Sequence, residues 1–261
     1  MTIHFDIIGA GIAAPGLPDW PSLAEAFAGG EPDLDRKPAP SCLLSPRERR
    51  RAPAAVKLSF AAAEQACAMA GLAPAEPVAV FSSGMGDLEI TDYMCGVLAN
   101  QPELLSPTRF HNSVHNAASG YWSIGAGATG DVTALSGWRD SATAGLIESL
   151  ARVVCDGQPV LLVVYDDIAH GPMQDLWPCR YAFCSALVLA PTGRTAPLAH
   201  LQATTTRGAD QHSPLPTSLA ERVEDNPAAR MLPLLGLIAG HLDGPVTLGA
   251  EQGPALVLTR E

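Results

Sequence analysis

The chain has 261 residues, of which 47% are hydrophobic and 16% are charged, a composition typical of a globular protein and not of a disordered or fibrous one. Its apolar runs, such as residues 160–165 and 231–238, are far shorter than the roughly 18 residues of a membrane-spanning helix. We therefore expect no membrane span. With a formal net charge of −11, the chain also has no broad basic face for phosphates, so we expect no nucleic-acid partner.

Val, Ile and Leu runs alternate with Ala-rich stretches, a pattern that predicts an α/β fold with buried strands. The first run is expected to be a strand and not a signal peptide, because Asp6 interrupts it and no basic leader precedes it. The chain is therefore expected to be cytoplasmic. In chain order the pattern predicts a strand at 3–8, helices at 22–28 and 54–70 with a Pro-rich connection at 32–53, a strand at 78–81, helices at 90–98 and 114–124, a strand at 132–136, a helix at 141–154, strands at 160–165 and 182–189, a helix at 229–238, and closing strands at 246–248 and 255–258.

Gly9, Gly11 and Ala14 follow the first strand and superficially match the Gly-rich turn that binds dinucleotides. That site needs a helix N-terminus for the pyrophosphate, and Pro15 and Pro18 stand where the helix should begin. We interpret the glycines as a strand-end turn and expect no cofactor.

The run HNSVH at residues 111–115 places two histidines four residues apart, a spacing that on one helix allows both to bind a metal ion. A third ligand is lacking, and Asn and Ser stand where a zinc hydrolase has its Glu. The six cysteines form no CxxC pair, so we expect core thiols and no metal site. A polar helix that hydrogen-bonds internally or at an interface is the favoured interpretation.

Residues 136–141, with the sequence SGWRDS, lie where a strand is expected to give way to a helix, a common position for an exposed nucleophile. The run lacks the GxSxG pattern, and Ser141 is more simply explained as the N-terminal cap of the helix. Asp166 and Asp167 follow an apolar strand, where adjacent side chains point to opposite faces, so a strand-end turn explains them better than an acid–base pair.

Four arginines are packed around Glu48 in this otherwise acidic chain. They are Arg47, Arg49, Arg50 and Arg51. One interpretation is a solvated helix start, and the other is a docking patch for an acidic partner.

A recognisable motif runs through the middle of the chain. It consists of Asn116, Gly120, Ile124, Gly127 and Gly130, followed by the strand at 132–136 and the helix at 141–154. This motif resembles the segment that leads to the active site of β-ketoacyl synthases of the thiolase fold. The resemblance covers roughly residues 3–190 and implies an α/β, thiolase-like layered α-β-α fold, with a complete first half at 1–190 and a truncated second half, residues 191–261 being an abbreviated C-terminal extension. More narrowly, HNSVHNAASGYWSI resembles short ketosynthase-like proteins of aryl polyene and xanthomonadin-type pathways.

The resemblance breaks down at the nucleophile. Active members of the family carry a cysteine at the head of the helix, where the helix N-terminus favours the thiolate. The corresponding residue here is Arg139, or Asp140 if the alignment shifts by one, and no cysteine occurs between residues 95 and 155. The histidines beyond residue 190 stand in none of the family's motifs: His200, His212 and His241. No catalytic residue is therefore expected.

The resemblance implies a catalytically silent subunit, of the kind called a chain-length factor, that forms a heterodimer with an active ketosynthase and helps to bound its acyl tunnel. Such a pair elongates polyene, polyketide or fatty-acid-like chains on an acyl carrier protein. The residues that it places at the partner interface or tunnel are His115, Asn116, Gly120, Tyr121, Trp122 and Ile124. The arginines of residues 47–51 would then meet the acidic carrier.

Several alternatives stay open. Tyr121 and Trp122 fit a place in the chain's own core as well as at an interface. The same scaffold could act as an acyltransferase or hydrolase through Ser141 or His115. It could also be a homodimeric, non-catalytic scaffold.

Overall fold

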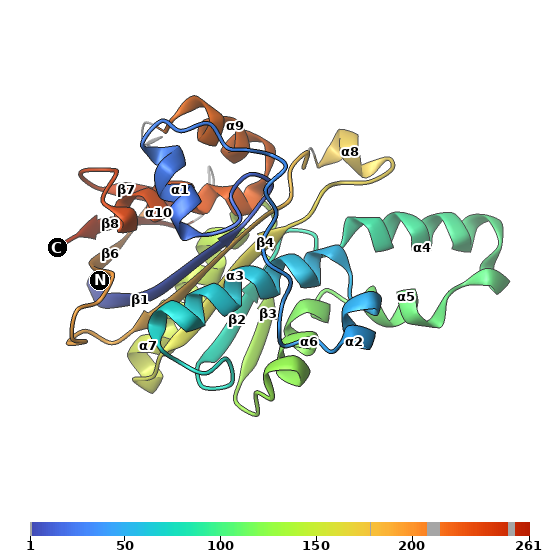
Figure 1. The fold of residues 1–261 in the computed structure, drawn as a ribbon, viewed down its shortest axis with the longest axis horizontal. Coiled ribbons are helices and arrows are strands. Elements are labelled where there is room, and N and C mark those ends of the chain that lie inside the picture. The colour runs from blue at the N-terminus through green and yellow to red at the C-terminus, as the bar shows by residue number, and fades with distance from the viewer. Residues whose placement is uncertain (1, 178, 208–214, 250–253) are drawn as a thin grey trace.

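The computed structural model describes residues 2–177, 179–207, 215–249 and 254–261. The described strands are β1 (Thr2–Ala13), β2 (Val78–Ser82), β3 (Val132–Leu135), β4 (Val160–Asp166), β5 (Phe183–Ala190), β6 (Ala199–Arg207), β7 (Val246–Gly249) and β8 (Pro254–Arg260). They form one eight-stranded sheet in the order β3-β2-β4-β5-β1-β6-β8-β7 (Figure 1). β2 pairs in parallel with β3 and β4, and the other neighbours pair antiparallel.

Helices connect these strands and cover both faces of the sheet (Figure 1). They are α1 (Trp20–Phe27), α2 (Pro46–Arg51), α3 (Ala54–Ala70), α4 (Leu88–Asn100), η1 (Pro102–Leu104), α5 (Pro107–Asn112), α6 (Ala117–Ala126), η2 (Trp138–Asp140), α7 (Ser141–Asp156), α8 (Met173–Leu176), α9 (Thr217–Asp225), η3 (Pro227–Met231) and α10 (Leu232–Ala239). Within the described residues, no helix is both long enough and apolar enough to span a membrane.

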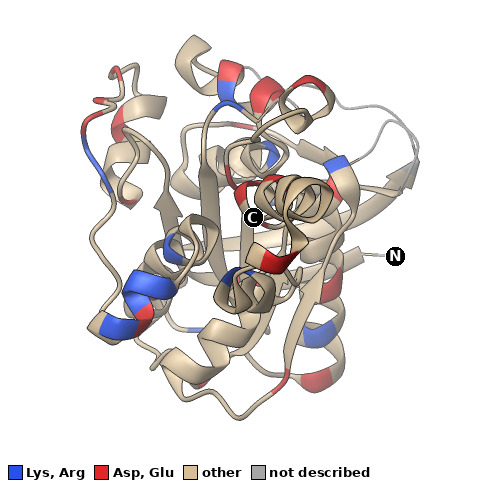
Figure 2. Ribbon diagram, turned by 90° about the vertical axis from the view of Figure 1, so that its right-hand side faces the viewer, with Lys and Arg blue, Asp and Glu red and all other residues tan. Residues whose placement is uncertain are grey.

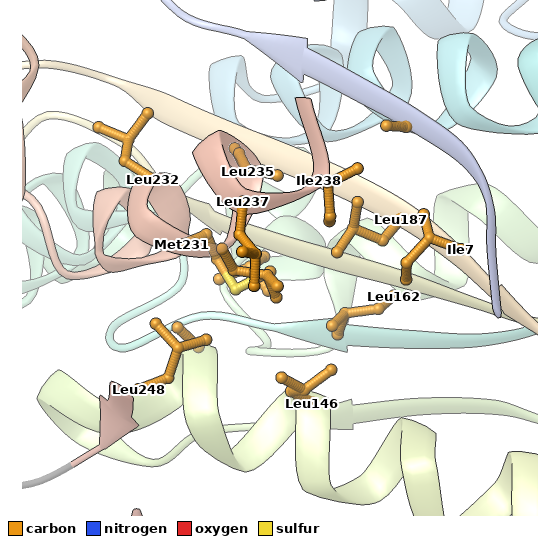
Figure 3. Close-up of a cluster of buried hydrophobic side chains, with 14 of the residues drawn as sticks. Ile7, Leu146, Leu162, Leu187, Met231, Leu232, Leu235, Leu237, Ile238 and Leu248 are labelled. Atoms are coloured by element: carbon orange, nitrogen blue, oxygen red, sulfur yellow. The ribbon is translucent and has the colours of Figure 1, made fainter. Parts of the chain in front are cut away.

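Each face of the sheet packs against its own hydrophobic core. On one face Leu146 of α7 and Leu235 of α10 pack toward Leu162 of β4 (Figure 3). On the other face α3 and α6 supply Phe60 and Trp122 against Val163 of the same strand. Adjacent residues of β4 thus belong to opposite cores, and β4 is buried along its whole length, as is typical of a central strand covered on both sides. The layers are helix, sheet and helix, as predicted.

The glycines after the first predicted strand bring α3 close to β1. A Cβ on Gly9 would lie 2.1 Å from the Ala66 carbonyl oxygen, and one on Gly11 would lie 2.1 Å from that of Ala62. Gln65 of α3 also donates to the Ile12 carbonyl oxygen at 3.0 Å. The expected strand-end turn is wrong, because β1 continues to Ala13 and its glycines serve helix packing.

Three other expectations about the elements are wrong. The helix expected at 114–124 begins only at Ala117, because residues 113–116 form a turn between α5 and α6. Residues 46–51 form α2 inside the segment expected only to connect. The tail also contains β6 and α9, which the pattern did not predict. β6 has the sequence AHLQATTTR, in which polar residues separate the apolar ones, so it lacks the continuous apolar run used to find the other strands.

Residues 199–207 and 254–260 belong to the same sheet as the strands before residue 190, because β6 pairs with β1 on one side and with β8 on the other. The boundary expected at residue 190 therefore falls between two strands of one sheet, and the division of the chain there stays a prediction. Away from the C-terminal strands, α4, η1 and α5 form an arm that projects from the layers, at the right of Figure 1. We refer to residues 88–112 as the arm.

Candidate functional site

The junction between β3 and α7, where a nucleophile was considered, is closed by hydrogen bonds around Ser141. The Ser141 hydroxyl donates to the Trp138 carbonyl oxygen at 2.7 Å and accepts from the Gly137 amide at 3.0 Å. The side chain is fully buried, and the Ser82 hydroxyl donates to the Ser141 carbonyl oxygen at 2.6 Å. Ser141 thus holds the turn that enters α7, as a capping serine would, although it is the first residue of the helix and Asp140 precedes it as N-cap.

Trp177 fills the space beside this junction. Its side chain is 1% exposed, and its ring lies edge-on to that of Trp138 with 4.5 Å between centroids. A Cβ on Gly84 would lie 2.5 Å from the Trp177 ring, so only glycine leaves room for it there. The cavity left beside Trp177 and Arg139 measures about 20 Å³. That volume holds about one water molecule and no acyl chain.

Arg139 and Asp140, which the sequence resemblance aligned with the family's nucleophile, both make surface contacts. Arg139 is exposed, with its guanidinium carbon 5.7 Å from the centre of the Trp177 ring. Asp140 Oδ1 lies 3.4 Å from Arg230 Nη1. Trp138, just before them, has a left-handed φ of 58°, a strained conformation for a bulky side chain. The junction therefore presents a cation over an aromatic ring, beside the buried Ser141 hydroxyl.

A buried carboxyl group lies on the other side of Gly84. Asp166 Oδ1 accepts a hydrogen bond from the Ser83 hydroxyl at 2.8 Å and from the Gly84 amide at 2.9 Å. Burial raises the pKa of Asp166 to about 7, although these donors act in the opposite direction. Asn226 donates to the Asp166 carbonyl oxygen at 3.1 Å. Asp166 is the last residue of β4, and it ties that strand to the end of β2 and to the η3 segment.

The cysteines divide into buried and exposed groups, and none lies at the junction. Cys67, Cys179 and Cys184 are buried, whereas Cys42, Cys95 and Cys155 are exposed. Burial raises the pKa of the three buried thiols, that of Cys67 to about 12. The expectation of core thiols is wrong for the three exposed cysteines, and the buried three are the opposite of activated nucleophiles.

The two histidines of the HNSVH run do not share a helix. His111 belongs to α5, and His115 lies in the turn before α6, where its Nε2 is 3.1 Å from the Ser83 carbonyl oxygen. Among the residues that the structure describes, no three His, Cys, Asp or Glu side chains are grouped to hold a metal ion. His212, which the sequence placed outside any family motif, lies outside the described residues.

Helix α6 has one face in the core and one face open. Trp122 is fully buried, with its ring centroid 5.1 Å from that of Phe60 and 6.0 Å from that of Phe81. Its expected place at a partner interface is corrected: it packs the chain's own core. Ile124, two residues further on, is 73% exposed, and nothing lies within 4 Å of a Cβ built on Gly120.

A groove of about 560 Å³ runs along this open face, between α2, α5 and α6. We call it groove 1. It is lined by Glu48, Arg51, Pro107, Thr108, His111, Asn112, Val114, Asn116, Ala117, Gly120, Tyr121 and Ile124. The Tyr121 hydroxyl donates to Asn112 Oδ1 at 3.2 Å, which fixes the ring in the groove wall. Groove 1 brings together four residues of the predicted interface set, and His115 and Trp122 lie outside its lining.

Large apolar side chains are exposed on the arm and on the segment that leads into α6. Leu98, Leu104 and Phe110 are 53%, 62% and 59% exposed, and Val114 is 53% exposed. The arm is braced by polar contacts: Arg109 lies 4.3 Å over the Tyr93 ring, and the Ser106 amide donates to the Tyr93 hydroxyl at 3.0 Å. A rigid support that presents apolar residues is typical of a protein-binding surface.

The arginines around Glu48 face different ways. Arg51 lines groove 1, whereas Arg49 and Arg50 line a second groove, between α2, α3 and the loop before α2. Arg49 Nη2 donates to the carbonyl oxygens of Ser41 and Leu44 at 2.8 and 3.1 Å, so its guanidinium is largely engaged within the chain. Arg47 lines neither groove. The sequence expectation of one uniform patch is therefore too simple.

Comparison with protein-family models matches residues 24–229 to the β-ketoacyl synthase N-terminal domain. The chain belongs to the β-ketoacyl synthase family. No curated protein sequence matches it.

Solved structures of ketosynthase complexes share the fold. One is a ketosynthase (ApeO) in complex with its chain length factor (ApeC) from Xenorhabdus doucetiae, similar over 99% of this chain and 100% of that chain, with a TM-score of 0.75 and 22% identity. The ishigamide ketosynthase/chain length factor matches over 78% and 67%, with a TM-score of 0.64 and 16% identity. The complex AntDE:AntF, a type II PKS acyl-carrier protein with its ketosynthase bound to the hexaketide, matches over 100% and 99%, with a TM-score of 0.73 and 11% identity. The predicted α/β, thiolase-like fold of this β-ketoacyl synthase family member is confirmed.

Sequence reasoning missed Trp177 and gave Asp166 no role beyond a turn. Trp177 is 38 residues from Arg139, directly after α8, and only the fold brings the two together. A signal for Asp166 was present, because an acidic residue directly follows the buried run VLLVVY. A carboxyl group at the end of a buried strand needs hydrogen-bond donors, and neighbouring Ser83 and Gly84 supply them.

Proposed function

We propose that this chain is a catalytically silent ketosynthase-like subunit, of the chain-length-factor type, that pairs with an active β-ketoacyl synthase and bounds its acyl tunnel. The proposed setting is elongation of a polyene, polyketide or fatty-acid-like chain on an acyl carrier protein, with aryl polyene-type pathways as the expected context. The observation that carries the proposal is the closed junction: it has Arg139 at the nucleophile position and a cavity of only about 20 Å³.

The open face of α6 supports the pairing. Ile124 and the arm residues expose apolar area that a stable monomer would normally bury, and such patches mark interaction sites. The space beyond Gly120 admits a close approach of another backbone. Tyr121 and Ile124 then supply an apolar wall, with Asn116 at its edge and His115 behind it in the turn.

The edge of the sheet at β3 is a second argument for an interface on the side of α6. β3 stands at the end of the strand order, so within the described residues its outer edge has no strand partner. Its four residues are half-buried. An exposed edge pairs readily with a strand of another chain, and covering β3 and α6 together would make one continuous interface.

The carrier protein is the second proposed partner. The chain has the net charge of an acidic protein, yet Arg47, Arg50 and Arg51 are exposed on α2, where Figure 2 shows a local concentration of basic residues. An acidic carrier would be attracted to this surface. Arg49 contributes mainly by holding the loop before α2, through its bonds to Ser41 and Leu44.

Two contacts weigh against the alternative of an independent acyltransferase or hydrolase that uses Ser141 or His115. Ser141 is buried with both of its hydroxyl hydrogen bonds made inside the chain, and the His115 ring nitrogen lies against the Ser83 carbonyl oxygen at 3.1 Å. A homodimeric scaffold would use the same open face, so the oligomeric state separates it from the heterodimer.

Co-expression with the active ketosynthase encoded in the same gene neighbourhood tests the proposal. We expect a one-to-one complex by size-exclusion chromatography with light scattering, and elongation activity on acyl carrier that requires both chains. The matched control replaces the catalytic cysteine of the partner by alanine, which should keep the complex and abolish activity. A stable homodimer of this chain that forms no complex with the ketosynthase would contradict the proposal and favour the homodimeric scaffold.

A further inference from the structure

A second groove, of about 790 Å³, lies on a different side of α2 from groove 1. We call it groove 2. Its residues are Pro38, Ala39, Pro40, Ser41, Leu44, Pro46, Arg49, Arg50, Ala54, Lys57, Leu58, Ala61, Asp167 and Ala182. None of them lines groove 1, so groove 2 is separate from the proposed tunnel wall. Its volume falls in the range of small-molecule sites.

The floor of groove 2 is apolar and preformed. Leu44 and Ala61 are 2% and 8% exposed and belong to the core between α3 and the sheet, and Leu58 packs against that core. The loop that forms the opposite wall is rich in proline, which restricts its backbone. Arg49 fixes this loop by its hydrogen bonds to Ser41 and Leu44. A pocket with rigid apolar walls suits an aliphatic chain.

The rim of groove 2 is cationic in an acidic protein. Residues 36–57 hold seven of the sixteen basic residues of the chain and only one acidic residue, Glu48. Arg50 and Lys57 lie on the rim and are exposed. Across the described chain neither of them makes an ion pair or a side-chain hydrogen bond. The rim therefore carries two exposed positive charges that have no ion-pair partner among the described residues.

One carboxyl group also faces groove 2, and it does not neutralise these cations. Burial raises the pKa of Asp167, and the neighbouring acids Asp87 and Glu89 act in the same direction, with only His170 acting against them among the charged groups. Asp167 accepts its hydrogen bond from the Ile168 amide at 2.8 Å. No contact between Asp167 and a rim cation is present in the described residues.

From this combination we propose that groove 2 is a binding site for an aliphatic chain with a carboxylate head, in which the tail lies on Leu44, Leu58 and Ala61 and the head meets Arg50 and Lys57. With both cations on the rim of one groove, each can donate to one oxygen of a carboxylate. The tail gains from the preformed apolar floor. This site shares Arg50 with the proposed carrier surface but no residue with groove 1, so it can hold without the pairing with a ketosynthase.

Binding of dodecanoate to the purified full chain, measured by isothermal titration calorimetry below the micellar concentration, tests the proposal. We expect saturable one-to-one binding that the double variant Arg50→Glu/Lys57→Glu weakens by roughly tenfold or more. The matched control is Arg47→Glu, which changes the same charge on the same helix outside both grooves and should alter binding by less than about twofold. Leu58→Gln, on the apolar wall, should weaken binding while leaving both cations in place.

Ligand variants separate head from tail, and thermal unfolding of each protein variant checks that it is folded. Dodecanol and acetate should each bind far more weakly than dodecanoate, because each lacks one half of the recognised chemistry. Dodecyl phosphate binding more tightly than dodecanoate would replace the carboxylate by a phosphate head and overturn the stated class. Equal losses in Arg47→Glu and the double variant, or binding of an acidic peptide without any binding of dodecanoate, would also overturn the proposal.

Discussion

The junction at the start of α7 and the open face of α6 lie close together in the chain and differ in almost every physical respect. At the junction, Ser141 is fully buried, Trp177 is 1% exposed and the remaining cavity is about 20 Å³. At the open face, Ile124 is 73% exposed and groove 1 measures about 560 Å³. The junction that the sequence resemblance aligns with the family's nucleophile is filled, and the surface beside it is open.

This contrast is what we expect if the chain uses the family's scaffold for its surface and not for a reaction. Closing the junction uses Trp177, a residue from a loop distant in sequence, and glycine at position 84 to admit its ring. At Gly120 and Ile124 the open face exposes apolar surface to water. A chain that works alone would be more stable if this surface were buried. Both observations are explained if a partner supplies the nucleophile and covers the open face.

The largest expected effect separates the two faces of α6. Trp122→Ala should lower the free energy of unfolding by about 3–5 kcal/mol, because it removes a fully buried ring between Phe60 and Phe81. Tyr121→Phe is the matched control and should cost about 1 kcal/mol, for the single hydrogen bond to Asn112. Urea denaturation measures both. Similar small losses would mean that Trp122 does not belong to the core.

The buried carboxyl group beside the junction predicts a pH dependence. Because the pKa of Asp166 is raised to about 7 in the folded chain, the folded state keeps a proton that the unfolded state releases near pH 4. The Asp166 carboxyl group therefore adds its full contribution to the free energy of unfolding below about pH 4. That contribution is lost as pH rises toward 7, at about 1 kcal/mol per pH unit. Asp166→Asn keeps an oxygen that accepts from Ser83 and Gly84 and cannot ionise.

The unfolding free energy of Asp166→Asn relative to the native chain should therefore rise by about 2 kcal/mol between pH 5 and pH 7. Denaturant titrations of both proteins at each pH give this difference, in which other titrating groups cancel. A difference that is constant with pH would contradict the raised pKa of Asp166.

The open face predicts an effect on assembly without one on folding. Ile124→Asp should weaken the complex with the ketosynthase by about tenfold or more, because it places a charge in an apolar contact, and should change the stability of the isolated chain by less than about 0.5 kcal/mol. Val154→Asp, on an exposed part of α7, is the matched control. Equal weakening by both variants would place the interface elsewhere.

The smallest effect concerns the junction serine. Ser141→Ala should lower the unfolding free energy by about 1 kcal/mol, because the Gly137 amide and the Trp138 carbonyl oxygen lose their hydroxyl partner. Elongation by the complex should keep its rate. A loss of rate greater than the loss of folded protein would assign Ser141 a chemical role.

The sequence predicted most of the layers because they depend on local patterns. The bounds of α3 were predicted as observed, since Ala-rich helix formers run up to Gly71, whose φ of 68° ends the helix. β6 was missed because its inward residues alternate with Thr and Gln, and it is a strand only because β1 and β8 pair with it. Tertiary pairing of that kind leaves little trace in a single segment.

The candidate site was predictable in identity but not in geometry. The missing cysteine is visible in the sequence, as are Gly120 and Ile124. The closure of the junction is not visible, because Trp177 and Gly84 come from separate loops and meet only in the fold. The sequence also did not show which aromatic residue of α6 is buried. Tyr121 and Trp122 fit a core and an interface equally well until the orientation of the helix is known.

Intact mass spectrometry of the ketosynthase complex after incubation with acyl carrier protein tests the central claim most directly. If the junction is silent, the acyl adduct appears on the partner ketosynthase alone, and this chain keeps its unmodified mass. An acyl adduct on this chain that Ser141→Ala or His115→Ala removes would contradict the account and establish catalysis on the scaffold itself.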